Sequence, residues 1–141
     1  MSKTIAATAL SAALALGIAT AAHAETTISA LFMSQAAYSE QNVRDMTADF
    51  MKANPDIKVN VEFVPYEGLR DKTLLSQGAG GGYDVVLFDV IWPAEYAENK
   101  VLVDVTDRIT PDMKSAIMPG AWTTVDYKDH AYGMPWILDT K

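Results

Sequence analysis

Runs of apolar residues and regular alternation predict three β-strands. Residues 85–88 (Val-Val-Leu-Phe) are apolar without interruption, which is typical of a strand covered by helices on both faces of a parallel sheet. From 57 to 63, apolar and polar residues alternate, which predicts a strand with one polar face at the edge of a sheet. Residues 27–33 predict a first strand that is buried toward its end.

Helical spacing predicts one helix after the first strand and another after the second. The first helix is expected from the N-cap Ser39 to about Ala53. Its apolar face consists of Val43, Met46, Thr47, Phe50 and Met51. The second helix is expected over residues 67–77. Its inward side chains are Leu69, Leu74 and Leu75.

Shorter elements are predicted after the third strand. Pro93 suits the first position of a short helix, and Thr110 suits the cap of another. Residues 122–134 predict a hairpin whose first strand begins at Trp122 and which turns at 128–130 (Lys-Asp-His). The order strand, helix, strand, helix, strand predicts an α/β fold with a mostly parallel sheet of at most three strands.

The first 24 residues have the composition of a secretory signal peptide. Lys3 is their only charge, residues 5–18 are apolar with small side chains, and residues 22–24 (Ala-His-Ala) supply a small-x-small cleavage pattern. The apolar run is short for a membrane-spanning helix, although an uncleaved anchor is the alternative. We therefore expect cleavage before Glu25 and export of a soluble protein to the periplasm.

Composition excludes several classes of function. The 141 residues carry a formal charge of −7, which argues against nucleic acid or an anionic membrane surface as partner. The absence of cysteine excludes disulfides, thiolate metal sites and a cysteine nucleophile. After loss of the signal peptide His130 is the only histidine, which excludes a multi-histidine metal site. No cofactor is expected.

The glycine run at 78–82 (Gly-Ala-Gly-Gly-Gly) could be read as a phosphate-binding loop. Such loops follow a strand and open a helix, whereas this run closes a predicted helix and precedes a strand. No Gly-Lys-Ser/Thr follows it. We interpret it as a helix stop and turn.

Asp89 and Trp92 are the main candidates for ligand binding. They follow the apolar strand at 85–88, and ligands of open α/β sheets lie beyond the carboxyl ends of the strands. A carboxylate that accepts hydroxyl hydrogen bonds, beside a flat apolar ring, suits a sugar. The alternatives are a helix cap for Asp89 and a core position for Trp92. Weaker candidates on loops, a helix start and the end of the chain are Gln35, Tyr38, Glu40, Arg70, Trp136 and Asp139.

Four segments in order resemble one known family. They are residues 49–59 (Asp-Phe-Met-Lys-Ala-Asn-Pro-Asp-Ile-Lys-Val), 78–87 with the glycines and Tyr-Asp-Val-Val, 102–107 (Leu-Val-Asp-Val-Thr-Asp) and 132–136 (Tyr-Gly-Met-Pro-Trp). The chain thereby resembles the extracellular solute-binding proteins, family 1, of ABC importers. Residues 89–95 (Asp-Val-Ile-Trp-Pro-Ala-Glu) are most similar to the branch that carries trehalose, maltose and other α-glucosides.

The resemblance implies a type II periplasmic binding-protein-like fold of two α/β lobes. Such a protein is a monomer that closes on a sugar by a hinge and delivers it to membrane permease subunits, without catalysis. The family has roughly twice this length or more, so residues 25–141 are expected to be its N-terminal lobe, a fragment that ends near the first hinge crossing, with the second lobe missing. Residues 128–130 replace a usual Asp-Gly-Lys turn, a departure that concerns only the hairpin.

Two other classes of function stay open. A secreted glycoside hydrolase could pair Asp84 with Asp89, but these residues lie at opposite ends of one predicted strand, about 17 Å apart at strand rise, too far for acid–base chemistry. Neither Gly-x-Ser-x-Gly nor His-Glu-x-x-His occurs. The other class is a binding protein for a polyol, a polyamine or a metal.

Overall fold

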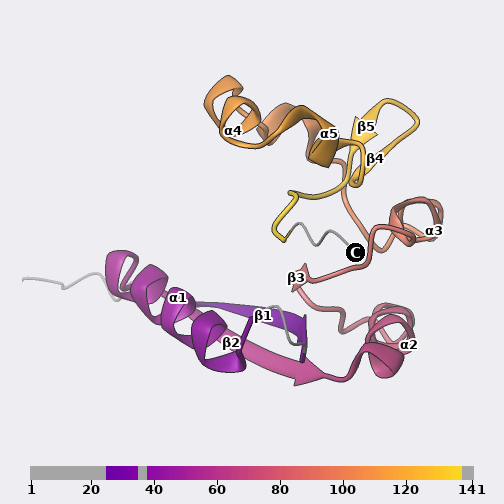
Figure 1. Ribbon diagram of the computed structural model, residues 1–141. Helices are drawn as coiled ribbons and strands as arrows, with labels where there is room; N and C mark the ends of the chain where they lie inside the picture. Colours follow the sequence, from indigo (N-terminus) through magenta and orange to yellow (C-terminus); the bar gives the residue numbers. More distant parts are fainter. Residues whose placement is uncertain (1–24, 35–37, 138–141) are drawn as a thin grey trace, which may run out of the picture.

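The computed structural model describes residues 25–34 and 38–137 (Figure 1). The predicted signal peptide and two predicted site residues, Gln35 and Asp139, lie outside these ranges. The described chain begins with β1 (Thr26–Met33), α1 (Glu40–Ala53), β2 (Ile57–Val64), α2 (Tyr66–Gly78) and β3 (Val85–Val86). It continues with α3 (Pro93–Glu98), a 3-10 turn (Thr106–Arg108), α4 (Pro111–Ala116), α5 (Pro119–Trp122), and a hairpin of β4 (Asp126–Tyr127) and β5 (His130–Ala131).

The first three strands form a parallel sheet in the order β2-β1-β3. β1 pairs with β2 from Thr26 opposite Ile57 to Met33 opposite Val64. On its other side β1 pairs with the two residues of β3. The predicted parallel α/β arrangement and the edge position of β2 are therefore confirmed.

β3 differs from the prediction. Its apolar run indicated a strand covered on both faces, but among the described residues β3 lies at the edge of the sheet, and Val85 is 48% exposed. The central strand is β1, which buries Ala30 and Leu31. An uninterrupted apolar run indicates that both faces can be covered, but it does not say which elements cover them.

The helices begin where the sequence indicates. Ser39 forms a capping box with Asn42 at the start of α1, and the Thr110 hydroxyl accepts a hydrogen bond from the Met113 backbone N–H, 3.2 Å away, at the start of α4. α3 begins with Pro93 at its first position. These caps were predictable because each depends on residues at most three positions apart.

The predicted inward faces are only partly correct. Val43 of α1 and Leu69 of α2 are buried, whereas Met46, Phe50 and Leu75 are exposed. The three described strands offer a narrow surface, so each apolar helix face is covered only in part; Leu74 of α2 is partly buried against the core cluster. Helical periodicity identified the apolar side correctly and overestimated how much of it is covered.

The hairpin is shorter than predicted. Trp122 ends α5 and does not begin a strand; β4 and β5 each have two residues. Lys128 and Asp129, between them, have φ angles of 50° and 64°. Positive φ angles at both central positions are typical of the two-residue turns that fit the twist of hairpin strands. The turn therefore lies where the sequence predicted it.

Candidate functional site

A hollow of about 1210 Å³ lies between the sheet and the chain from Lys100 to Ile137. It follows β3 and reaches the carboxyl ends of β1 and β3. Its wall there is formed by Phe32, Met33, Ser34, Tyr66, Leu87, Phe88, Asp89, Val90, Tyr132, Gly133, Met134, Pro135, Trp136 and Ile137. The wall is mostly apolar, and Asp89 is the acidic group at this end.

Asp89 is held in the turn between β3 and α3. Its Oδ1 accepts a hydrogen bond from the Ile91 backbone N–H at 3.2 Å, and its backbone carbonyl accepts one from Trp92 at 3.0 Å. The side chain is half-buried and lines the hollow. This side-chain-to-backbone turn fixes the carboxylate at the carboxyl end of the sheet, where ligands of such sheets bind.

Trp92 lies behind this surface and does not line the hollow. It is 7% exposed and belongs to the core cluster with Leu31, Leu69 and Tyr96. Its ring stacks on Tyr66, with centroids 5.5 Å apart and planes inclined by 21°. In this structure the indole is therefore a core side chain, the alternative that the sequence left open.

Tyr66 was not predicted as a site residue, although it stands beside Asp89. It opens α2, lines the hollow and is 41% exposed. Partial desolvation, followed by the charge and hydrogen bond of the neighbouring Asp89 carboxylate, raises the pKa of the Tyr66 hydroxyl. The signal that could have found it is its position directly after β2, at the same end of the sheet as Asp89.

Tyr38 and Trp136 meet at the carboxyl end of β1. Their ring centroids are 4.8 Å apart, and Trp136 also contacts the Phe32 ring edge-on at 5.3 Å. The Tyr38 hydroxyl donates a hydrogen bond to the Met33 carbonyl, and burial raises its pKa. Trp136 is 39% exposed and lines the hollow, so two residues predicted from distant parts of the sequence form one aromatic group.

Glu40 lies beside this aromatic group but does not line the hollow. Its Oε1 accepts a hydrogen bond from the Ser34 hydroxyl at 2.8 Å, and its Oε2 is 3.6 Å from Arg44. Ser34 does line the hollow. Glu40 is thereby tied to the wall through Ser34.

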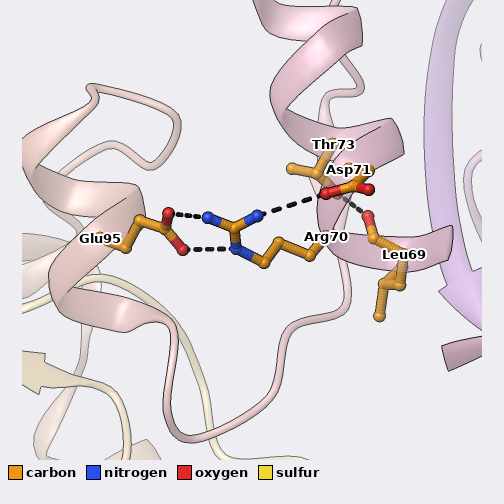
Figure 2. A network of polar contacts seen from close by, with 5 residues as sticks. All are labelled: Leu69, Arg70, Asp71, Thr73 and Glu95. Atoms are coloured by element: carbon orange, nitrogen blue, oxygen red, sulfur yellow. Dashed lines mark hydrogen bonds and ion pairs between the residues drawn. The ribbon is translucent and has the colours of Figure 1, made fainter. Parts of the chain in front are cut away.

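Arg70 is engaged by carboxylates on the helices (Figure 2). Its Nε donates to Glu95 Oε2 at 2.8 Å, Nη2 contacts Glu95 Oε1, and Nη1 is 3.2 Å from Asp71 Oδ1. Hydrogen bonds from Arg70 lower the pKa of Glu95. The pair joins α2 to α3, and Arg70 is not part of the hollow's wall.

Asp84 has a structural partner. Its Oδ2 accepts hydrogen bonds from the backbone N–H and the hydroxyl of Ser29, both at 2.8 Å, and these bonds lower its pKa. The Asp84 backbone N–H donates to the Ser29 carbonyl at 2.9 Å. This clasp at the start of β3 gives Asp84 a role in strand pairing.

Of the predicted site residues that the structure describes, Asp89 and Trp136 line the hollow. Tyr38, Glu40 and Trp92 contact residues of its wall, and Arg70 is paired with Glu95 and Asp71 instead. Their roles in binding stay predictions. Within residues 25–34 and 38–137, no three or more His, Asp or Glu side chains are grouped as metal ligands would be, and no helix is long and apolar enough to cross a membrane.

Comparison with known sequences relates the chain to one family. The sequence pattern described as bacterial extracellular solute-binding protein matches residues 35–140. A curated relative, the maltotriose-binding protein of Pyrococcus abyssi, is 26% identical over 100 residues, which are 71% of this chain and 22% of the relative. The chain therefore spans about a fifth of that relative's length.

Solved structures of solute-binding proteins also match this chain. The sugar-binding protein MalE from Xanthomonas citri is 30% identical with a TM-score of 0.70, over 79% of this chain and 28% of that one. A solute-binding protein from Thermotoga lettingae, bound to α-D-tagatose, is 26% identical with a TM-score of 0.71, over 79% and 29%. The predicted type II periplasmic binding-protein-like fold is thereby confirmed.

Proposed function

Because the chain belongs to the bacterial extracellular solute-binding proteins, we propose that it is the sugar-binding subunit of an ABC importer. The observation that carries the proposal is the family match over residues 35–140, whose relatives include a protein named for maltotriose and a sugar-binding MalE. Asp89, fixed on the wall of the hollow, adds a group suited to sugar hydroxyls. The role is binding without catalysis.

The proposed ligand is a di- or oligosaccharide of the α-glucoside type. In the proposed contact, Asp89 accepts hydrogen bonds from sugar hydroxyls while half-exposed aromatic rings of the wall, among them Trp136, cover the apolar CH faces of the pyranose. Residues 25–141 would form the N-terminal lobe, and a second lobe would close over the sugar by a hinge. The sugar would then pass to permease subunits at the membrane.

The proposed location is the periplasm, reached with the signal peptide of residues 1–24 and followed by its cleavage. The protein would act there as a monomer. The family's extracellular description supports this location.

Titration calorimetry tests the proposal on the protein produced from its complete open reading frame. At least one of the sugars maltose, maltotriose and trehalose should bind to the protein. Asp89→Ala should weaken that binding by about 1–3 kcal/mol, the cost of losing a hydrogen bond to a charged group. Asp49→Ala on α1, which also removes a carboxylate but does not line the hollow, is the matched control and should bind as the unaltered protein does. Absence of binding to all three sugars would reject the α-glucoside assignment.

A further inference from the structure

Tyr66 and Asp89 form a small surface whose two parts come from different βα connections. Tyr66 is the first residue of α2, directly after β2, and Asp89 follows β3. Both line the hollow, and Asp89 is near enough for its charge to contribute to the raised pKa of the Tyr66 hydroxyl. An aromatic face and an acceptor therefore adjoin each other at the carboxyl end of the sheet.

One face of the Tyr66 ring is covered by the protein. The Trp92 ring stacks on it at 5.5 Å, and Trp92 in turn contacts Tyr96 at 5.8 Å in the buried cluster. Tyr66 is nevertheless 41% exposed, whereas Trp92 is 7% exposed. In this stack the tyrosine ring is therefore the exposed one, and the buried indole packs against its other face.

Asp89 stands in the wall of the hollow near the same ring. Desolvation, and after it the charge of the Asp89 carboxylate, raises the pKa of the Tyr66 hydroxyl. Asp89 is itself anchored through Oδ1 to the Ile91 backbone N–H. The Tyr66 ring is held by its stack on Trp92 and the Asp89 carboxylate by the Ile91 N–H. Both are thus in place before any ligand arrives, which reduces the entropy that binding would cost.

Resting on the sugar-binding function proposed above, we propose that Tyr66, and not Trp92, supplies the aromatic platform on which a pyranose ring stacks in this lobe. Asp89, at the rim of the platform, accepts hydroxyl hydrogen bonds from the same sugar ring. Trp92 is a positioning residue that fixes the plane of Tyr66 from behind. A pyranose fits because it presents an apolar CH face to the ring and hydroxyls at its rim.

The test compares four variants of the full-length protein by titration calorimetry with maltose and maltotriose. Tyr66→Ala should weaken binding about tenfold or more, because it removes the platform. Tyr66→Phe keeps the ring and should restore most of the affinity. Trp92→Phe keeps an aromatic ring stacked on Tyr66, and its dissociation constant should stay within about threefold of that of the unaltered protein. Phe50→Ala removes a ring of similar exposure, 43%, from α1 outside the hollow, and should change nothing.

Melting temperatures without sugar separate binding from folding. Tyr66→Ala should lose affinity while remaining folded at the temperature of the titration. If it binds both sugars as tightly as the unaltered protein, or if a folded Trp92→Phe loses more affinity than Tyr66→Ala, the platform assignment is overturned although the protein still binds sugar. If the unaltered protein binds neither sugar, the proposed function is not supported for these sugars, and the assignment of Tyr66 as a sugar platform is rejected as well.

Discussion

Replacement of Trp92 by alanine should mainly destabilise the fold. The indole is 7% exposed and packs in one cluster with Leu31, Leu69 and Tyr96, each at most 1% exposed. These residues come from β1, α2 and α3, so the side chain joins three elements of the fold. Removing it deletes ring contacts to Tyr66 at 5.5 Å and Tyr96 at 5.8 Å.

The expected cost follows from burial. Truncation of a buried tryptophan to alanine costs about 3–5 kcal/mol, since transfer free energy is lost and a cavity remains. Domains are stable by only about 5–15 kcal/mol, so the variant should be close to unfolding at moderate temperature. Trp92→Phe retains a ring in the cluster and should cost clearly less.

Urea denaturation followed by far-ultraviolet circular dichroism measures this difference. Trp136→Ala is the matched control, because it removes a side chain of the same type from a position that is 39% exposed. It should lower the free energy of unfolding by less than half as much as Trp92→Ala. A free energy of unfolding unchanged by Trp92→Ala, or a larger loss for Trp136→Ala, would refute the assignment of Trp92 to the core.

Three further predictions concern pH, export and the extent of the chain. Arg70 lowers the pKa of Glu95 below its ordinary value of 4.5. The ion pair therefore stabilises the folded protein fully above pH 4.5, and this stabilisation is lost as the pH falls through the lowered pKa of Glu95. Unfolding free energy should therefore decline with acidification more steeply in the unaltered protein than in Glu95→Gln, and equal slopes between pH 5 and 2 would count against the pair. N-terminal sequencing of periplasmic protein should find Glu25 first, and a sequence beginning at Met1 or Ser2 would contradict cleavage. The 141-residue chain alone should show no rise in melting temperature with maltose or trehalose, whereas a full-length protein at a hundredfold excess over Kd gains about 2.7 kcal/mol; a shift of that size in the short chain would show that one lobe suffices.

Local features of the fold were predictable because their causes lie within a few residues. Ser39 caps α1 through Asn42, three positions later, and alternation within β2 indicates its edge position. The position of β3 was not predictable, because an apolar run does not reveal what covers it. Val85 is accordingly half-exposed at the edge of the described sheet.

The site was predictable only in part, for a similar reason. Strand order placed Asp89 at the carboxyl end of the sheet, as found. The sequence left open whether Trp92 turns inward, and it did not indicate that Tyr66 lies over it, since that contact joins residues in different connections. The partner of Arg70, Glu95, is likewise 25 positions away in the sequence.

The clasp between Asp84 and Ser29 has a consequence for how the chain tolerates insertions and deletions. β3 has only two ladder residues, so the clasp contributes much of its alignment, and Asp89 follows Asp84 by five positions. Because side chains alternate along an extended segment, adding or removing one residue within 85–88 would turn Asp89 to the opposite side and away from Tyr66. The glycines before the clasp differ among themselves. A side-chain carbon on Gly78 or Gly81 would meet no atom within 4 Å, and on Gly82 it would meet chiefly the flexible Gln77 side chain, whereas Gly80 has a φ of 75°, which favours glycine. A length change in the glycine run leaves the spacing from Asp84 to Asp89 unaltered, so it should be tolerated better than one in the five residues that follow Asp84.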